Sequence, residues 1–593
     1  MDTRKLRRAF LFLIPVLICL FSMPAGSAIG AAGLKPRATA DLAPQRGYRA
    51  GDPALKVRPT TGDDTAASDD VPAAVQARIH ALRQAQLAQV EQANPDGPVC
   101  WCEGCTSVLV GKAASIDGST MTSHSCDSTS DRTWMNVVPN RKHKPGETAK
   151  VYYLPKETKG PDDPDRVETG EIPQVAETYA YLNAAYPIMN EHQLAIGETT
   201  FGGKREMQSD NGIIDCPELY RLCLERAKTA REAITVADEL TTQHGYNDWG
   251  EAFTFADPNE VWLFEIVGPG KGKKGAVWAA VRIPDDEVSV SANAPRIRTL
   301  NLTDKEHFLA SANVQTAAQE MGFWDPKSGK AFEFCYAYGS RTAMGSRRRE
   351  WRALSRIAPS LRLDAFDENY PISVKTEKKL SVQDLLAIFR DVYQDTPFDM
   401  TRTLMTVGRD GKAVKSPIAN PFMNNDYLNA LKIPSERTIA CKRATYLQIT
   451  QSRAWLPNPI GGLVWLGYDN PMTTPHTPFY IGIAQMPASY MVDGRARFRR
   501  DCAWWAYRQV SQLAFFRWQD MVREIEKVWR PIEDKAFAEQ AKVEAEAQRL
   551  YKEDPQKARE YLTKYSQGIA SGAVDAYWKL AEDLWTKYTN YFH

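Results

Sequence analysis

Residues 104–128 read GCTSVLVGKAASIDGSTMTSHSCDS, and the rest of the chain is best interpreted outward from this stretch. Apolar side chains alternate at 107–110, which is the period-2 pattern of a half-buried strand. The pair Asp117-Gly118 tolerates the positive φ of a tight turn, and a Ser- and Thr-rich extended run follows at 119–125. The stretch therefore predicts a β-hairpin.

Folding this hairpin about Ile116 predicts a register in which Asp127 lies opposite Cys105. Strand pairing would then bring a carboxylate close to a thiol. Gly104 precedes the cysteine and has no side chain, so the peptide bond between them is open to attack. A thiol, a nearby carboxylate and a cleavable bond are what a nucleophile at a newly exposed amino terminus requires.

Two other interpretations of Cys105 stand beside this one. A lone cysteine at the start of a strand is commonly a small buried hydrophobe. A zinc site is the second alternative, since Cys100, Cys102, Cys105, His124 and Cys126 would gather at the open end of the hairpin. Zinc ligands usually come in pairs spaced C-x(2–4)-C, and Cys100-x-Cys102 is tighter than that. The residues alone leave all three interpretations open.

The stretch resembles the start of the mature chain in the cysteine dipeptidases of the N-terminal nucleophile (Ntn) hydrolase superfamily. Typical members read C-T-x-x-L-V-G-K-x-A-S-x-D-G-S-T-M, and penicillin V acylases and bile salt hydrolases are more distant relatives. The matching positions are Cys105, Thr106, Leu109, Val110, Gly111, Lys112, Ala114, Ser115, Asp117, Gly118, Ser119, Thr120 and Met121. Many members continue with A-R-N-E-D, whereas this chain keeps Asp127 and has His124 in place of the Arg.

Further blocks of similarity lie at 188–198, 275–297 and 435–437. The resemblance implies an α+β fold, the four-layer αββα Ntn-hydrolase sandwich in which two antiparallel sheets pack between helices. It also implies a helical C-terminal extension.

The same resemblance implies roles in amide hydrolysis. Cys105 is expected to attack the scissile carbonyl with its own α-amine as base, because an amine pKa of about 7.7–8.0 suits neutral pH. Asp127 would hold the amine and the thiol, while Asn190 and Asn293 would stabilise the oxyanion. Turn-capping and strand-end roles are the alternatives for the two asparagines. Arg437 lies where distant relatives carry an active-site Arg, although a surface ion pair is the ordinary role of an arginine.

The expected activity is cleavage of unblocked dipeptides, since enzymes of this type recognise a free amino terminus beside the scissile bond. His124 is expected to bind substrate, and activity should weaken below about pH 6.5 as its imidazole becomes charged. The alternatives are an N-acyl amide hydrolase of the penicillin acylase type on the same fold and a non-catalytic, zinc-stapled binding protein. The sequence does not determine the side-chain preference for dipeptides.

Residues 1–28 have the features of a secretory signal: a basic start, an apolar run and small residues before a cleavage site. The apolar run is shorter than the roughly 20 residues that span a membrane, so an anchor is the weaker alternative. The protein is therefore expected to be exported, to the periplasm or the extracellular space. No membrane anchor is expected after signal removal.

The remainder of the chain divides into three predicted parts. A partly disordered pro-segment is predicted at 29–104, ending at the cleavage site between Gly104 and Cys105. The catalytic domain is predicted at 105–500 and a helical extension at 501–593.

Composition excludes several function classes. The 593 residues contain 74 Lys and Arg against 73 Asp and Glu, a net charge of +1, which gives no electrostatic basis for nucleic-acid binding. The sequence lacks H-E-x-x-H, G-x-S-x-G and a Walker loop. No metal or cofactor is therefore expected, small peptides are the expected partners, and a homo-oligomer is compatible with the sequence.

Two patterns predict the helices most directly. Apolar spacing predicts one helix over 216–241, and Gly568 and Gly572 are expected to bracket a break before the last helix. Removal of the signal and pro-segment would leave an odd number of cysteines, so at least one thiol is expected to be unpaired.

Overall fold

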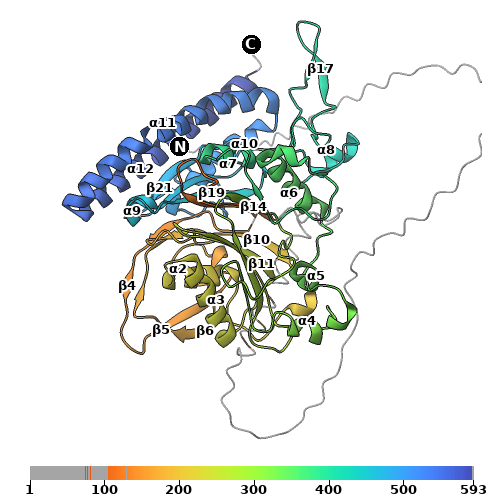
Figure 1. Cartoon of the computed structure of the whole chain (residues 1–593). Helices are drawn as coiled ribbons and strands as arrows, with labels where there is room; N and C mark the ends of the chain where they lie inside the picture. The colour runs from red at the N-terminus through yellow and green to blue at the C-terminus, as the bar shows by residue number, and fades with distance from the viewer. Residues whose placement is uncertain (1–73, 75–76, 78–80, 82–103, 129, 591–593) are drawn as a thin grey trace, which may run out of the picture. The chain divides into compact units, whose positions relative to one another are not determined.

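The computed structural model describes residues 74, 77, 81, 104–128 and 130–590, all within one compact unit. The predicted signal segment and nearly all of the predicted pro-segment lie outside the described residues. Two antiparallel sheets dominate the described part, with helices packed beside them (Figure 1). The expected α+β class, with antiparallel sheets and a helical C-terminal region, is confirmed.

The first sheet has seven strands and contains the predicted hairpin at its centre. Its strands, in sheet order, are β16 (Ser373–Lys375), β14 (Glu287–Ser291), β1 (Gly104–Val110), β2 (Thr120–Asp127), β19 (Ala444–Ser452), β20 (Leu463–Tyr468) and β21 (Thr477–Tyr480). Every neighbouring pair is antiparallel. Because β14 and β19 flank the hairpin, neither β1 nor β2 is an edge strand.

The second sheet has eight strands and is built mostly from the middle of the chain. In sheet order they are β15 (Phe308–Ala310), β13 (Val277–Ile283), β12 (Val261–Val267), β11 (Gly250–Ala256), β10 (Ala195–Gly202), β9 (Met189–Asn190), β8 (Tyr181–Asn183) and β3 (Asn136–Val138). All of these pairs are antiparallel as well.

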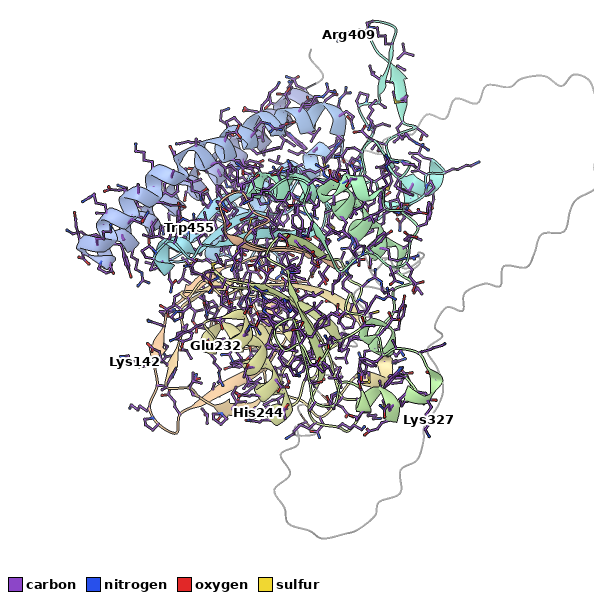
Figure 2. The ribbon with its side chains drawn as sticks, viewed as in Figure 1. Lys142, Glu232, His244, Lys327, Arg409 and Trp455 are labelled. Carbon is purple, nitrogen blue, oxygen red and sulfur yellow. The ribbon has the colours of Figure 1, made fainter. Side chains whose placement is uncertain are left out.

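The two sheets face one another, and hydroxyl groups link them. Ser107 Oγ donates to the carbonyl of Glu198 at 2.9 Å, and the hydroxyls of Thr122 and Thr254 lie 2.6 Å apart. A Cβ on Gly197 would lie 2.4 Å from the carbonyl oxygen of Ser123, so only glycine permits this close approach. Side chains fill the space between the ribbons (Figure 2), and residues of both sheets share one hydrophobic core.

Two helices replace the single helix that was predicted over 216–241. They are α2 (Cys216–Arg226) and α3 (Ala230–His244). Thr229 has extended backbone and caps α3, since its hydroxyl accepts a hydrogen bond from the Glu232 amide at 3.2 Å. The prediction of one helix was wrong because the apolar spacing continues across the turn between the two.

The C-terminal region is helical, as predicted, but its break lies elsewhere. It consists of α10 (Ala503–Ala514), α11 (Trp518–Glu553) and α12 (Pro555–Thr589). The chain turns at Asp554, whose side chain caps α12 just before a proline at the first helical position. The break that was predicted around Gly568 is absent, because α12 runs through this glycine without interruption. α11 and α12 lie side by side (Figure 1).

Further α-helices and three small sheets complete the described part of the chain. The other α-helices are α4 (Thr316–Glu320), α5 (Phe334–Tyr338), α6 (Met344–Ile357), α7 (Val382–Phe389), α8 (Asn425–Ala430) and α9 (Asn458–Gly461). The small sheets pair β4 (Arg141–Lys142) with β7 (Glu177–Thr178), β5 (Thr148–Tyr153) with β6 (Val167–Pro173), and β17 (Met405–Val407) with β18 (Ala413–Lys415). Within the described ranges, none of the helices combines the length and apolarity that crossing a membrane requires.

Candidate active site

The register of the central hairpin differs by one residue from the prediction. Cys105 lies opposite Cys126, and Asp127 lies opposite Gly104. The prediction assumed a symmetrical turn about Ile116, whose amide instead donates to the carbonyl of Leu380 at 3.0 Å. The loop is thus shaped by contacts with distant segments that the hairpin sequence does not reveal.

The register decides which side chains share a face of the sheet. Directly opposed residues point to the same face, and side chains alternate along each strand. Cys105, Cys126 and His124 therefore share the face toward the second sheet, while Asp127 belongs to the opposite face. The thiol and the Asp127 carboxylate are not side by side, contrary to the predicted pairing.

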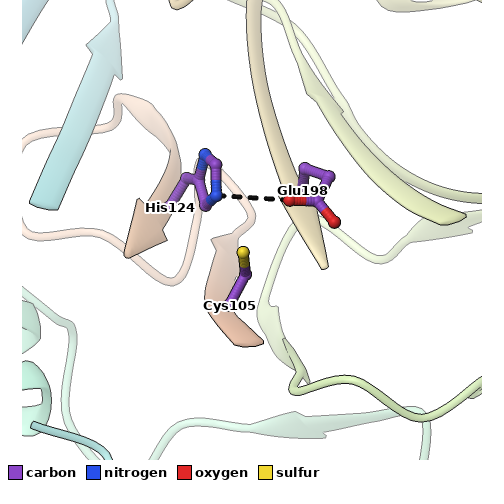
Figure 3. A group of neighbouring side chains, drawn as sticks. All are labelled: Cys105, His124 and Glu198. Atoms are coloured by element: carbon purple, nitrogen blue, oxygen red, sulfur yellow. Dashed lines mark ion pairs between the residues drawn. The ribbon is translucent and has the colours of Figure 1, made fainter. Parts of the chain in front are cut away.

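The thiol of Cys105 is buried next to an imidazole and a carboxylate. Its Sγ, a ring nitrogen of His124 and a carboxylate oxygen of Glu198 all lie within 4.8 Å of one another (Figure 3). Burial, and next the negative charge of Glu198, raise the pKa of the Cys105 thiol well above its usual value. The thiol is therefore protonated in this arrangement and needs a proton acceptor before it can react.

His124 lies deep in the site rather than at its surface. The side chain is fully buried and makes edge contacts with the rings of Tyr186 and Tyr446, with centroid distances of 5.1 and 5.7 Å. Its Nε2 lies 3.3 Å from Glu198 Oε2. Its expected role in substrate binding stays a prediction, and the structure places it beside the nucleophile.

Glu198 was not singled out from the sequence, although it ends one of the blocks of similarity. It lies on β10, and Thr200 Oγ1 donates to its Oε1 at 2.9 Å. Burial opposes its ionisation, yet the adjacent His124 and Glu251 side chains hold the pKa of Glu198 below its usual value. Burial and the charge of Glu198 raise the pKa of Glu251 well above its usual value. The sequence feature that could have identified Glu198 as a site residue was a single carboxylate within a strand of otherwise uncharged residues.

Asn293 contacts the backbone nitrogen of Cys105. Its Oδ1 accepts from that nitrogen at 2.9 Å, and its Nδ2 donates to the carbonyl of Thr200 at 2.7 Å. Asn293 has a left-handed φ of 59°, which asparagine tolerates better than most residues. The structure therefore brings Asn293 to Cys105, as expected, but as an acceptor for the nitrogen.

Asn190 has a different environment. Its Nδ2 donates to the carbonyls of Leu224 and Ala227, both at 2.8 Å, at the end of α2. Its Oδ1 accepts from the amides of His192 and Leu194. Both amide hydrogens are in use, so in this conformation Asn190 has none to give to an oxyanion. The geometry corresponds to the turn-stabilising alternative.

Arg349 is a site residue that the sequence did not reveal. It lies on α6, and its Nη1 donates to the carbonyl of Cys105 at 2.7 Å and to Thr106 Oγ1 at 2.9 Å. Its Nη2 donates to Asn293 Oδ1 at 2.8 Å. Burial, and next the charge of Arg437, lower its pKa to about 10, so it stays charged at neutral pH. The sequence feature that could have identified Arg349 was a run of charged residues on a helix that must also pack against a sheet.

Asp127 forms a buried ion pair with Arg437, which brings two predicted site residues together. Its Oδ1 has no hydrogen-bond partner among the described residues. Burial raises the pKa of Asp127 above its usual value, against the opposing charges of Arg437 and Arg349. Gly104, opposite Asp127 in the register, places the predicted cleavage site next to this carboxylate.

The predicted set of zinc ligands is not assembled as expected. Cys100 and Cys102 lie outside the described residues. The thiol of Cys126 donates to Asp131 Oδ2 at 3.1 Å, which gives it a partner other than Cys105. The described cysteines, all buried and all unpaired, are Cys105, Cys126, Cys216, Cys223, Cys335, Cys441 and Cys502.

Comparison with known proteins identifies the family of the chain. Residues 104–531 match the description Peptidase family C69, and the match begins one residue before Cys105. The chain belongs to peptidase family C69. This confirms the resemblance to cysteine peptidases of the Ntn type that the hairpin suggested.

Relatives of this C69 peptidase include three proteins with related names. A "Probable dipeptidase" of Latilactobacillus sakei is 26% identical over 65% of this chain and 76% of its own length. A "Probable dipeptidase B" of Streptococcus pyogenes serotype M1 is 23% identical over 78% of this chain and 89% of its own length. A "Dipeptidase A" of Lactobacillus helveticus is 24% identical over 69% of this chain and 81% of its own length.

Proposed function

We propose that this C69 peptidase hydrolyses unblocked dipeptides with Cys105 as an amino-terminal nucleophile. One observation carries the proposal: at the start of β1 the nitrogen, carbonyl and thiol of Cys105 each have their own buried partners. Membership of the family and the dipeptidase names of the relatives support peptide-bond hydrolysis as the reaction.

Maturation would expose the nucleophile. The thiol of Cys105 attacks the carbonyl carbon of Gly104, the C–N bond between the two residues breaks, and a thioester forms on Sγ. The thiol proton passes to the departing nitrogen, which becomes the α-amine of Cys105. Water then hydrolyses the thioester, which releases Gly104 with a carboxylate and restores the thiol.

The mature site would cleave a peptide by the same chemistry. The α-amine accepts the proton of the buried thiol as Sγ attacks the substrate carbonyl, and it later gives that proton to the leaving amine. Asn293 Oδ1 already accepts from this nitrogen at 2.9 Å, so it would hold the amine in place. Asp127 has an oxygen without a partner that would receive the charged amine. Water releases the acyl group from Sγ.

Two groups near Cys105 would stabilise the developing oxyanion. Asn293 uses one of its two amide hydrogens in the described contacts, and the other is available. The guanidinium of Arg349 supplies positive charge at the Cys105 carbonyl. Arg437 would act indirectly, through Asp127, because it pairs with that carboxylate rather than contacting the thiol.

Two wider proposals accompany this function. The two facing sheets and their helices fit the four-layer αββα Ntn sandwich, with α10, α11 and α12 as the C-terminal extension. The features of residues 1–28 support export to the periplasm or the extracellular space, followed by removal of residues up to Gly104.

Two assays test the function. Intact-mass measurement of the active protein should give a chain that begins at Cys105, and Cys105→Ala should stay at precursor length without activity. Mature enzyme should hydrolyse Ala-Ala much faster than N-acetyl-Ala-Ala. Faster hydrolysis of the acetylated compound would instead place the protein among N-acyl amide hydrolases. Active protein that begins well upstream of Cys105 would rule out the nucleophile mechanism.

A further inference from the structure

Three possible metal-donor atoms lie close together in the site: the sulfur of Cys105, a ring nitrogen of His124 and a carboxylate oxygen of Glu198. One ligand atom from each residue lies within 4.8 Å of the other two, and all three residues are buried (Figure 3). Thiolate, imidazole and carboxylate are the three side-chain ligands of zinc. The set differs from the one that the sequence suggested, since it shares only Cys105 and His124 with it.

The spacing of the donors fits a tetrahedral ion. Two ligands that each lie about 2.0–2.2 Å from a tetrahedral zinc are separated from each other by about 3.4 Å. His124 Nε2 and Glu198 Oε2 are 3.3 Å apart. These two atoms are therefore spaced as two ligands of one tetrahedral ion, and Cys105 Sγ lies within 4.8 Å of both.

The donor atoms lack hydrogen bonds that would compete with an ion. Both ring nitrogens of His124 and Oε2 of Glu198 are buried without a hydrogen bond among the described residues, and Nε2 and Oε2 face each other as an ion pair at 3.3 Å. Buried polar atoms in proteins seldom lack a hydrogen-bond partner. The other oxygen of Glu198 accepts from Thr200 Oγ1 at 2.9 Å, which is the outer-shell contact that usually orients a metal-binding carboxylate.

We propose that the mature protein binds one Zn²⁺ through Cys105 Sγ, His124 and Glu198, and that this ion reversibly blocks the nucleophile. The thiol loses its proton to solvent on binding, and its sulfur lone pair then bonds the metal rather than a substrate carbonyl. This inhibitory role rests on the proposed function. Maturation adds a fourth donor, because the free α-amine and the thiolate of Cys105 close a five-membered chelate ring.

The chemistry of the donors selects the ion. A thiolate and an imidazole favour zinc over magnesium and calcium, which prefer oxygen ligands. The Arg that many relatives carry in place of His124 cannot bind a cation, so the site depends on this substitution. Millimolar Mg²⁺ or Ca²⁺ should therefore leave both the site and the activity unaffected.

Direct metal binding tests the proposal. Mature protein freed of metal with a chelator should take up one Zn²⁺ per chain in competition with a chromophoric chelator. Co²⁺ in its place should give the near-ultraviolet thiolate-to-cobalt absorption that reports ligation by Cys105. His124→Gln should weaken Zn²⁺ binding at least about tenfold, and Thr200→Val, which removes the outer-shell contact, about 10–100-fold. His307→Gln, at a half-exposed histidine outside the site, is the matched control and should bind normally.

The outcomes separate this proposal from the proposed function. Metal-free enzyme that cleaves Ala-Ala but takes up no Zn²⁺ overturns the zinc site alone. The same conclusion follows if the His124→Gln variant binds Zn²⁺ as tightly as the wild type does. Protein that binds one Zn²⁺ through Cys105 yet hydrolyses no dipeptide overturns the dipeptidase function alone. Stoichiometric Zn²⁺ that leaves the hydrolysis of Ala-Ala unchanged overturns the inhibitory role.

Discussion

Asn293 Oδ1 lies 2.9 Å from the backbone nitrogen of Cys105 and would come within 2.5 Å of a Cβ placed on the preceding Gly104. One carbonyl oxygen therefore holds the nitrogen that would become the amine and leaves no room for a side chain before it. The requirement for glycine at the proposed cleavage site is thus steric.

Gly104→Ala should slow the release of the pro-segment. The added methyl displaces the Asn293 amide from the Cys105 nitrogen, and a misplacement of about 1 Å at a reacting centre costs on the order of 100-fold in rate. We expect processing to slow about 10–100-fold, measured by intact mass against time. Gly568→Ala is the control, since a Cβ there meets nothing within 4 Å. Equal processing rates for the two variants would show that Asn293 does not position the Cys105 nitrogen for cleavage.

Asp127→Asn should keep the fold but lose most activity. The variant leaves the partly buried Arg437 without its counter-ion, and the loss of one partner of a buried pair costs about 3–5 kcal/mol. Because Arg437 retains some exposure, we expect the low end of that range in denaturant unfolding. Turnover of Ala-Ala should fall at least about 100-fold if the carboxylate holds the charged amine. Asp410→Asn, on an exposed loop, should behave as wild type, and near-wild-type turnover of Asp127→Asn would disprove the role.

Arg349→Lys should reduce turnover while the chain stays folded. Arginine reaches the Cys105 carbonyl and Asn293 at once through two nitrogens, whereas lysine has one ammonium and cannot reproduce this fork. We expect kcat for Ala-Ala to fall about 10–100-fold with a smaller change in KM. Arg347→Lys, two residues away on the same helix, is the control. A change confined to KM would mean that Arg349 binds substrate rather than stabilising the oxyanion.

Glu533→Gln tests how α11 is attached to the rest of the molecule. Burial opposes the charge of Glu533, but Arg390 and His476 lower its pKa to about 2. A carboxylate with a lowered pKa stabilises the fold above its unfolded pKa, and this contribution is lost as pH falls towards the folded value. Glu533→Gln should therefore cost about 3 kcal/mol at pH 7, from a shift of about 2.5 pH units at 1.36 kcal/mol each. The difference from wild type in denaturant unfolding should shrink between about pH 4.5 and 2. A difference independent of pH would show that packing, not charge, is lost.

The sequence predicted local features of the hairpin better than its register. Alternation and an Asp-Gly turn are properties of adjacent residues, so the two strands were found. The register depends on the amide of Ile116, which bonds to Leu380 more than 260 positions away in the chain. No pattern within the hairpin carries that information.

The site shows the same division between local and distant information. Asn190 ends β9 and Asn293 follows β14, yet only Asn293 contacts Cys105, since the side-chain nitrogen of Asn190 donates to carbonyls at the end of α2. Glu198 and Arg349 were missed because their importance comes from the second sheet and from α6, which reach Cys105 only in the folded chain. Residue types in the sequence reduced the number of candidate site residues, and tertiary packing determined which of these candidates contact Cys105.

The unpaired state of the described cysteines has a consequence for how the protein is made. None of these buried thiols is joined to another, so folding of this part requires no oxidant, chaperone-catalysed thiol exchange or particular redox potential. The same stability should therefore be found in reducing and in oxidising media. All seven described thiols are buried, so a thiol-directed label should count seven cysteines in the mature protein only after it has been unfolded.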